Sequence, residues 1–246
     1  MNRFGFEESE ASALVEFFKG AKNLQLRGIC SHLACGEDIL QKGGFSALQL
    51  EKFQSIRRYF PNQICHLLNS SGFLAIFNNE QDDLSLGVRL GLLLYGVVPA
   101  SFGGSQLNLQ PVMQLKSEVV AFHKLKQGDC VSYVATWTAK RTTTIGIVPI
   151  GYSDGYDRQF SNKGQVLFRG QKVPVVGSVC MDYLMVDLTD VLAGSEGVCG
   201  EEIVLFGEQG GERLGVSEVA QMAGKISYEL LTNIGRRVPR VYIEGL

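Results

Sequence analysis

The sequence lacks three features that would assign it to a large class of proteins. Its longest unbroken apolar-plus-glycine run, Leu90 to Ala100, is well short of the roughly 18 residues of a membrane-spanning helix. Its 23 basic residues nearly cancel its 25 acidic ones, so the net charge of -2 gives no general attraction to nucleic acid or anionic lipid. The amino terminus has neither a basic region followed by an apolar stretch nor a small-residue cleavage site. We therefore expect a cytoplasmic protein that binds small molecules or protein, with no nucleic acid and no membrane.

Cysteine is also sparse, because the six thiols are scattered through a medium-sized chain and suit free buried groups better than a disulfide scaffold. One spacing, Cys30-Ser-His32-Leu-Ala-Cys35, raises the possibility of a metal site. A closed zinc site needs four ligands, and the neighbours in the only other Cys-His pair, Cys65-His66, would point to opposite faces of a strand. We predict no metal site. His32 itself is either a core histidine or a functional group at the carboxyl end of a parallel strand.

The first 105 residues alternate between helical and strand periods. A helix is predicted over Ala11 to Phe18, ending near Gly20, and a second around Leu50 to Phe60, ended by Pro61. Strands are predicted at Leu24 to His32, Ile64 to Leu68 and Ser85 to Leu94. This order is typical of a parallel sheet with crossover helices.

After Pro99 the pattern changes to one strand after another, and the stretch Ala100 to Asn108 is the predicted boundary. The residues Gly170-Gln171 are predicted to form a hairpin turn, and Ser217 to Ala223 a short helix with a serine N-cap. The other predicted strands are Val112 to Leu125, Cys130 to Ala135, Thr142 to Ile150, Tyr183 to Leu188 and Glu202 to Phe206. The fold class is therefore α/β for residues 1–105 followed by all-β for residues 106–246.

Several short segments could contribute to a site, although each has an ordinary structural explanation. Asn69-Ser70 and Gly91 resemble loop ends that present backbone N–H groups to a phosphate, and each could equally be a common turn. The segment Gly151-Tyr-Ser-Asp-Gly-Tyr156 could be a tight turn with packed tyrosines, and the thiol and thioether of Gly177-Ser-Val-Cys-Met-Asp182 could be core filling.

Taken together and in order, these segments resemble alanine racemase, a pyridoxal-phosphate enzyme of the barrel type. The resemblance covers the whole chain. The matching pieces are Met1-Asn-Arg-Phe-Gly-Phe6, Ser31-His32, Asn69-Ser70, Val88-Arg-Leu-Gly91 with Tyr95-Gly96, Val131-Ser-Tyr133, Gly151-Tyr-Ser-Asp-Gly155, Cys180-Met-Asp182, Tyr228-Glu229 and Arg237-Val-Pro-Arg-Val-Tyr242.

The resemblance implies that residues 1–105 are the latter part of a pyridoxal-phosphate-binding (β/α)₈ barrel, and that residues 106–246 are a β-barrel-like carboxyl-terminal domain. It implies a homodimer in which each active site is shared between the barrel of one subunit and the β-domain of the other. The implied reaction is the interconversion of L- and D-alanine by two-base proton transfer on the cofactor, supplying D-alanine for peptidoglycan and the cell wall. Serine or another small amino acid is an alternative substrate.

The resemblance also assigns roles to individual residues. Tyr133 corresponds to the base that removes the α-proton, helped by His32, which is itself paired with Arg89. Arg89 corresponds to the arginine against the pyridine nitrogen, where it donates a hydrogen bond without protonating the ring. The remaining assignments are Ser70, Gly91, Leu92 and Tyr228 for the cofactor phosphate, Arg3 and Met181 for the substrate carboxylate region, and Tyr152 and Asp182 for the entrance.

One expected element is missing from the sequence. None of the lysines from Lys19 to Lys225 stands in the family's Lys-Ala-Asn-Ala-Tyr motif, which supplies the second base and the covalent anchor of the cofactor. We therefore expect the chain to begin in the middle of a barrel and to have no racemase activity by itself. The alternatives are a non-catalytic remnant, one subunit of a split enzyme, or the tail of a fusion with another cell-wall enzyme.

Overall fold

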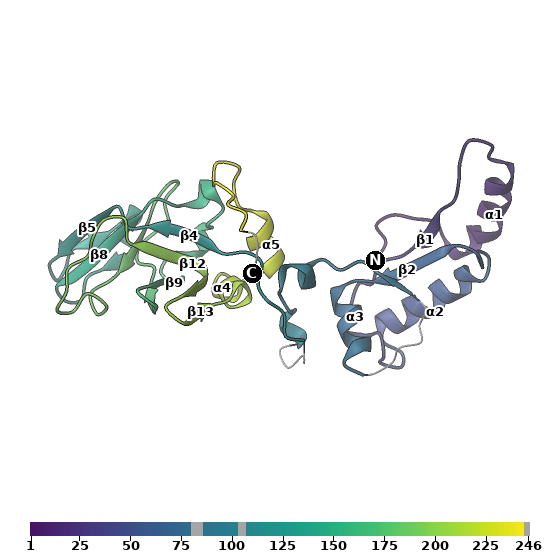
Figure 1. The fold of residues 1–246 in the computed structure, drawn as a ribbon, viewed down its shortest axis with the longest axis horizontal. Helices are drawn as coiled ribbons and strands as arrows, with labels where there is room; N and C mark the ends of the chain where they lie inside the picture. Colours follow the sequence, from purple (N-terminus) through teal and green to yellow (C-terminus); the bar gives the residue numbers. More distant parts are fainter. Residues whose placement is uncertain (80–85, 103–106, 244–246) are drawn as a thin grey trace. The chain divides into compact units, whose positions relative to one another are not determined.

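A computed structural model of the chain describes residues 1–79, 86–102 and 107–243. The chain forms two compact units, Met1–Gln110 and Pro111–Leu246. Helices accompany the strands in the first unit, whereas strands predominate in the second (Figure 1). Within the described ranges, no helix combines the length and the apolar character that crossing a membrane requires.

The first unit is built on a small parallel sheet, in which the strand order is β1-β2-β3. Because neighbouring parallel strands need a crossover, the chain passes through helices between β1 and β2 and between β2 and β3. The strands are β1 (Gly28–Cys30), β2 (Ile64–Leu68) and β3 (Gly87–Val88), and the helices are α1 (Ala11–Gly20), α2 (Phe45–Arg57) and α3 (Ser70–Phe77).

The core of this unit lies between β2 and the helices that follow β1 and β2. Leu67 on β2 is completely buried and packs in one cluster with Phe53 of α2 and Ala75 of α3. The other buried members of the cluster are Leu33, Ile39, Cys65, Leu68 and Ile76. This packing fixes the carboxyl end of β2 and the start of α3, where part of the candidate site is found.

The periodicity predicted most of these elements. The helix ending at Gly20 and the strand Ile64–Leu68 are confirmed. The second helix ends at Arg57, three residues before the predicted end, because the chain turns ahead of Pro61. The strand expected over Leu24 to His32 is only the three-residue β1. Asn69-Ser70, which resembles a loop end in the sequence, is instead the cap and first residue of helix α3.

The predicted strand Ser85 to Leu94 is wrong for most of its length. Within its described part, β3 has two residues, and the chain then enters a 3₁₀ turn at Leu92–Tyr95. Its first residue, Ser85, and residues 103–106 of the predicted boundary lie outside the described residues. An apolar run of this length therefore contains a strand end, a turn and a buried leucine pair rather than one strand.

The second unit consists of antiparallel sheets with two short helices. One sheet has the order β10-β9-β12-β13 with β4 also paired to β12, a second has the order β11-β8-β5, and β6 pairs with β7. The strands are β4 (Leu115–Glu118), β5 (Ala121–Leu125), β6 (Cys130–Val131), β7 (Trp137–Thr138), β8 (Thr143–Val148), β9 (Gln165–Phe168), β10 (Gln171–Pro174), β11 (Leu184–Asp187), β12 (Glu202–Gln209) and β13 (Glu212–Leu214). The helices are α4 (Val216–Met222) and α5 (Ser227–Thr232).

Four details of this unit differ from the sequence predictions. The strand predicted over Cys130 to Ala135 is only the two-residue β6, and a 3₁₀ turn follows at Tyr133–Ala135. The run Val112 to Leu125 forms two strands, β4 and β5, that belong to different sheets. The hairpin turn is centred on Arg169 and Gly170, both with positive φ (50° and 71°), one residue earlier than predicted. Helix α4 begins one residue earlier than predicted, so its N-cap is Gly215 and not the serine.

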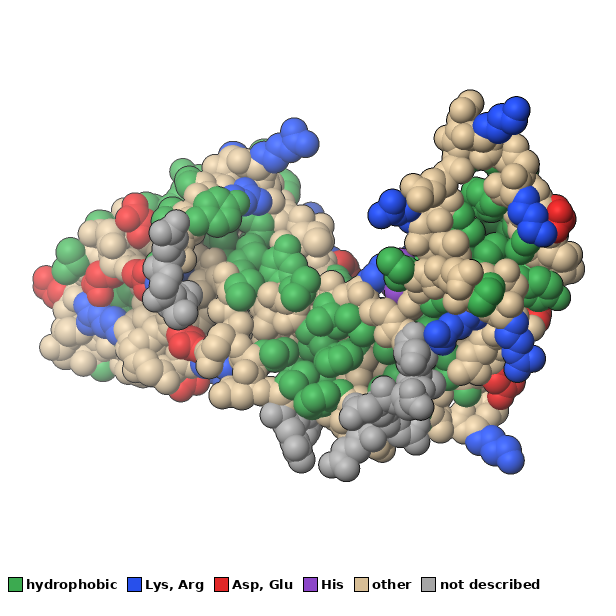
Figure 2. Space-filling view, turned by 45° about the vertical axis from the view of Figure 1, so that its right-hand side comes forward, with side chains coloured by type: hydrophobic (Ala, Val, Ile, Leu, Met, Phe, Trp, Pro, Cys, Tyr) green, Lys and Arg blue, Asp and Glu red, His purple; other side chains and the backbone are tan. Residues whose placement is uncertain are grey.

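Hydrophobic side chains reach the surface in both units (Figure 2). Phe4 and Phe6 are exposed in the first unit, and Tyr133 and Val134 are exposed in the second. Apolar side chains of this size are more often buried. Phe4, Phe6 and Tyr133 are exposed in segments that the sequence assigns to a site, and Val134 directly follows one of them.

Candidate active site

The first cluster of predicted site residues surrounds the start of helix α3. Asn69 caps the helix: its Oδ1 accepts the Gly72 amide at 2.9 Å, and its Nδ2 donates to the Leu33 carbonyl at 3.3 Å. Ser70 is almost fully buried, and its Oγ accepts the amide of Gly91 at 3.1 Å. The carboxyl ends of β2 and β3 thereby bring Ser70, Gly91 and Leu92 together beside a helix N-terminus, where N–H groups without partners favour an anion.

The second cluster is formed by Arg89 and two histidines. The Arg89 guanidinium donates to the carbonyls of Ser31 at 2.5 Å and His66 at 3.1 Å. It also contacts Nδ1 of His32 at 3.2 Å and Nδ1 of His66. Because arginine can only donate, both ring nitrogens that face it must accept, which leaves the proton of each neutral imidazole on Nε2.

The pairing of Arg89 with His32 agrees with the residues assigned from the sequence, but the role of His66 was missed. In the sequence, His66 stands out only as half of the Cys65-His66 pair, a potential metal ligand. Among the described residues, no cluster of three or more His, Cys, Asp or Glu side chains is placed to hold a metal ion. A signal for close contact was present: Gly87 stands opposite His66, and a Cβ there would lie 2.9 Å from the His66 Cβ.

The surroundings of His32 lower its pKa below the usual 6.5. Desolvation is the largest cause, followed by the charges of Arg89 and Arg3. A folded-state pKa below the unfolded value means that protons bind the unfolded chain more strongly. The contribution of His32 to stability is therefore complete above about pH 6.5 and is lost as the pH falls through the lowered folded pKa.

Changing Arg89 to glutamine is expected to raise the pKa of His32 toward its usual value, because one positive charge is removed. The return will be incomplete, because burial of the ring remains the larger cause. An NMR titration of the His32 ring C–H signals measures the change. Arg27→Gln, which removes an exposed charge from the same unit, is the control, and an unchanged His32 titration in Arg89→Gln would contradict the pairing.

Tyr133 lies in an unusual turn of the second unit, directly after β6. Its side chain is 70% exposed. The residues around it, Ser132, Val134 and Ala135, all have positive φ, at 65°, 63° and 47°. Non-glycine residues rarely adopt this conformation, and a β-branched valine least of all, so surrounding contacts must hold the turn.

Those contacts come from two distant loops. The Ser178 hydroxyl donates to the Tyr133 carbonyl at 3.0 Å, and the Ser132 hydroxyl donates to the Ser178 carbonyl at 2.6 Å. Asn162 joins the same network: its Nδ2 donates to Thr136 Oγ1 at 3.0 Å, and its Oδ1 accepts the Gly177 amide at 2.7 Å. The turn that presents Tyr133 is therefore fixed by hydrogen bonds on both sides.

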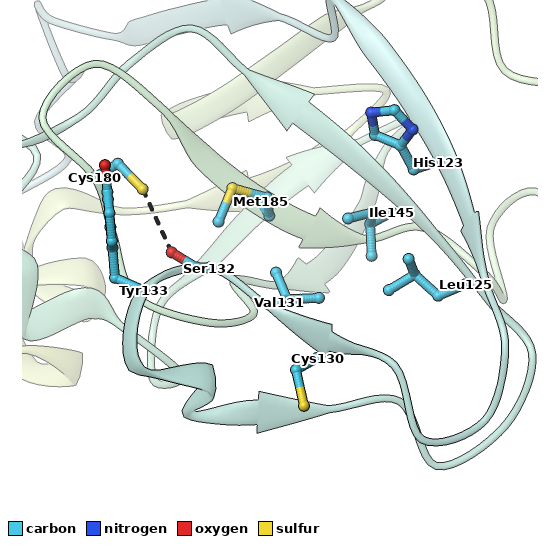
Figure 3. A pocket seen from close by; sticks show the side chains of 9 residues that line it. All are labelled: His123, Leu125, Cys130, Val131, Ser132, Tyr133, Ile145, Cys180 and Met185. Atoms are coloured by element: carbon cyan, nitrogen blue, oxygen red, sulfur yellow. Dashed lines mark hydrogen bonds between the residues drawn. The ribbon is translucent and has the colours of Figure 1, made fainter.

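A cavity of about 420 Å³ borders this turn. Figure 3 shows Tyr133 beside Cys180, whose Sγ lies 3.4 Å from the Ser132 Oγ. The rest of the lining is mostly apolar and comes from strands β5, β6, β8 and β11: His123, Leu125, Cys130, Val131, Ile145 and Met185. The phenol of Tyr133 is thus at the edge of a hollow rather than on a flat surface.

Tyr152 and Met181 lie on two loops whose backbones pair. The Tyr152 amide donates to the Cys180 carbonyl at 3.0 Å, and the Ser153 amide donates to the Met181 carbonyl at 3.1 Å. Both side chains stay exposed, at 42% for Tyr152 and 54% for Met181. Asp182 is adjacent, accepting from Arg237. The structure therefore brings these three predicted residues together.

The predicted site residues divide between the two units. Ser70, Gly91, Leu92, His32 and Arg89 lie at the carboxyl ends of the parallel strands of the first unit, and Arg3 is close enough to His32 to affect its pKa. The second unit carries the remainder, Tyr133, Tyr152, Met181, Asp182 and Tyr228, the last in α5.

Comparisons with known proteins match both units to one family. The family sequence models described as "Alanine racemase, N-terminal domain" and "Alanine racemase, C-terminal domain" match residues 1–99 and 112–242. The chain is 37% identical to the alanine racemase of Thermodesulfovibrio yellowstonii and 36% identical to that of Geobacter sulfurreducens, over 99% of its own length in each case. It spans 62% and 64% of these two relatives.

Solved structures give the same result. The alanine racemase of a D-cycloserine-producing Streptomyces lavendulae matches with a TM-score of 0.86 and 31% identity, covering 100% of this chain and 64% of that one. The Bartonella henselae alanine racemase, solved with covalently bound pyridoxal phosphate, matches with a TM-score of 0.82 and 31% identity, covering 99% and 64%. The fold combines barrel-type and β-rich parts. From the matching models, relatives and structures together, this chain belongs to the alanine racemase family.

Proposed function

We propose that this chain provides the cofactor-binding end of the barrel and the tyrosine-bearing β-domain of a pyridoxal-phosphate-dependent alanine racemase. The observation that carries the proposal is the Arg89 guanidinium, which contacts both His32 and His66. Two positions after Arg89, the Gly91 amide donates to the Ser70 hydroxyl. A fixed cation lies near the N-terminus of a helix, which can bind an anion, and both are at the ends of neighbouring strands. This arrangement suits a phosphorylated aromatic ring.

The donors present fit the phosphate of pyridoxal phosphate. Ser70 offers its hydroxyl, the first turn of α3 offers N–H groups without helical partners, and Gly91 lets the backbone approach closely. We assign Leu92 to the same grip through its backbone, because the 3₁₀ turn begins there. Tyr228 of the β-domain is proposed as a further phosphate ligand on the basis of the family resemblance.

Arg89 fits the nitrogen of the pyridine ring. Its orientation is fixed by two carbonyls and two imidazoles, and at neutral pH it keeps its proton, so it donates a hydrogen bond without transferring the proton. Pyridoxal phosphate supplies an electron sink that acidifies the Cα–H of an attached amino acid. When the ring nitrogen is not protonated, the ring withdraws electrons less strongly, and this limits side reactions.

Tyr133 is proposed as the residue that moves the α-proton of L-alanine. A phenol normally keeps its proton at neutral pH, so it needs a neighbour that stabilises the oxygen after deprotonation. His32 suits this task because its Nδ1 faces Arg89, which leaves the Nε2–H free to donate. We infer that Tyr133 reaches the barrel of a second copy, in a homodimer that shares its sites.

The remaining assignments concern the substrate. Arg3 and Met181 are proposed to contact the carboxylate region of alanine, and Tyr152 with Asp182 to narrow the entrance to a small side chain. We propose that the product D-alanine is used in peptidoglycan synthesis for the cell wall, with the reaction in the cytoplasm, where the free amino acid is available.

The second base has no candidate among residues 1–246, because none of the lysines stands in the family motif. We expect this polypeptide alone to bind pyridoxal phosphate without a borohydride-reducible lysine link and without racemising alanine. Co-expression with an amino-terminal barrel segment of a curated relative that carries its lysine should restore D-alanine formation. Turnover by residues 1–246 alone would contradict the first expectation. No turnover after complementation would favour a non-catalytic module.

Changing Ser70 to alanine is expected to weaken the binding of pyridoxal phosphate about tenfold, because one charge-assisted hydrogen bond is lost. Titrating the purified chain with the cofactor and following its absorbance measures this. Ser71→Ala, at the next position of α3, is the matched control and should change affinity less than about twofold. Pyridoxal without the phosphate should bind both variants alike. If Ser70→Ala and Ser71→Ala bind the cofactor equally well, the phosphate site is misassigned.

A further inference from the structure

Three segments of the second unit converge on the guanidinium of Arg237. Its Nε donates to Asp154 Oδ1 at 2.6 Å, and its Nη2 donates to Asp154 Oδ2 at 3.2 Å. The same Nη2 contacts Ser153 Oγ and Asp182 Oδ1. One side chain therefore connects the carboxyl-terminal segment to the turn at residues 151–155 and to the loop at residues 180–182.

Asp154 makes the first of these connections rigid. Its side chain is nearly buried, and its Oδ2 also accepts the Gly151 amide at 2.9 Å, which closes the turn. Its carbonyl accepts the amide of Gly235 at 2.7 Å. A carboxylate this well buried needs a cation or several donors, and removing Arg237 would leave mainly one amide for that purpose.

The second connection joins the turn to the loop that carries Met181. The Ser153 hydroxyl donates to the Met181 carbonyl at 2.7 Å and lies 3.1 Å from Asp182 Oδ1. Gly151 lets the two backbones approach, because a Cβ at this position would lie 2.3 Å from the Cys180 carbonyl oxygen. Arg237 thus spans the place where the two entrance loops pair.

The charges support the same arrangement. Arg237 is the largest cause of a lowered pKa at Asp182, followed by the Ser153 hydroxyl. In turn, Asp154 and Asp182 raise the pKa of Arg237. Asp182 therefore stays charged at neutral pH, and the Arg237 cation lies between it and Asp154.

We propose that Arg237 is a positioning residue, which fixes the loop bearing Tyr152 against the loop bearing Met181 and so sets the size of the amino-acid side chain that the entrance admits. The effect on substrate size rests on the proposed racemase function, whereas the positioning of the two loops rests on the contacts of Arg237 alone. Arg237 touches neither substrate nor cofactor in this assignment, and it acts through Asp154, Ser153 and Asp182.

Amide hydrogen exchange in the 246-residue chain tests the positional part. In Arg237→Gln, the amides of Tyr152 and Ser153 should exchange at least about tenfold faster. The reason is that the loop at residues 180–182, which accepts their hydrogen bonds, loses its contact with Arg237. Arg237→Lys should give an intermediate rate, since lysine keeps the charge but lacks the planar fork. Unchanged exchange in Arg237→Gln would overturn the proposal.

The matched control is Arg169→Gln, which breaks a comparable arginine network elsewhere in the same unit. Arg169 donates to Glu201 at 2.6 and 2.8 Å, and to Ser195 Oγ and the Glu196 carbonyl at 3.0 Å each. The Arg169→Gln variant should lower the stability of the unit without changing the amide exchange rates of Tyr152 and Ser153. Equal acceleration by both variants would mean general loosening and would also overturn the positioning role.

Substrate selection in the complemented racemase tests the size part. Arg237→Gln should raise kcat/KM for L-2-aminobutyrate relative to L-alanine severalfold, chiefly through KM, and Arg169→Gln should leave the ratio unchanged. An unchanged ratio in Arg237→Gln would overturn the link to substrate size. If the complemented wild type fails to racemise, the proposed function fails, while the exchange rates still decide whether Arg237 positions the loops.

Discussion

Replacing Tyr133 with phenylalanine is expected to slow removal of the α-proton from L-alanine by about 10²- to 10⁴-fold, the usual contribution of a positioned acid–base group. The phenol oxygen is the only heavy atom lost. The turn should remain intact, because it is held through the Tyr133 carbonyl and the Ser132 hydroxyl rather than through the ring. The effect should therefore be chemical and not structural.

Deuterium incorporation from heavy water into alanine, measured separately for the two enantiomers in the complemented racemase, checks this prediction. Loss of the tyrosine should affect proton removal from L-alanine more than binding of pyridoxal phosphate, since Ser70, Gly91 and Arg89, which are proposed to hold the phosphate and the ring nitrogen, are in the first unit. Tyr183→Phe, an exposed tyrosine whose backbone contacts Cys180, is the control and should retain full activity. A Tyr133→Phe rate within tenfold of the wild type would rule Tyr133 out as the base.

Gly155→Ala is expected to destabilise the β-domain by more than about 3 kcal/mol. Two costs combine at this position. The backbone has a φ of 106°, which an alanine rarely adopts, and a Cβ would lie only 2.4 Å from the Asn233 carbonyl oxygen. The contact is with backbone atoms and not with a flexible side chain. The added methyl could therefore fit only if the turn at 151–155 separated from the segment after α5.

Urea unfolding followed by circular dichroism measures this loss, and soluble yield reports it if the variant does not fold. Gly215→Ala is the matched control, since its added methyl has no heavy atom within 4 Å and its φ of -73° suits any residue. It should cost less than about 1 kcal/mol as a change at a helix N-cap. Equal midpoints for the two variants would show that the turn and the carboxyl-terminal segment are not packed as described.

The elements that the sequence predicted well are those whose pattern is local. The helix ending at Gly20 and the strand Ile64–Leu68 each show their own period along the chain. The run from Val112 to Leu125 shows why others failed: it is continuous in composition, yet its two halves pair with different strands, β12 and β8. Which partner a strand takes is decided by tertiary contacts that no short window contains.

The candidate site shows the same division. Residues such as Ser70 and Tyr152 were identified because they sit in short motifs that resemble a family, whereas His66 has no such motif. Its contact with Arg89 depends on the register that places His66 beside Gly87, 21 positions later. Asn162 and Ser178, which hold the Tyr133 turn, are likewise ordinary residues in ordinary loops. Their importance arises only from what the fold places next to them.

The parallel pairing of β1 with β2 has a consequence for synthesis of the chain. Gly28 pairs with Ile64, 36 positions later, so the first strand leaves the ribosome well before its partner exists. At about 5–20 residues per second, the delay is roughly 2 to 7 s. During that time the N–H and C=O groups of Gly28–Cys30 have no β2 to bind. The speed of translation thus sets how long this strand is available to a chaperone or to a wrong partner.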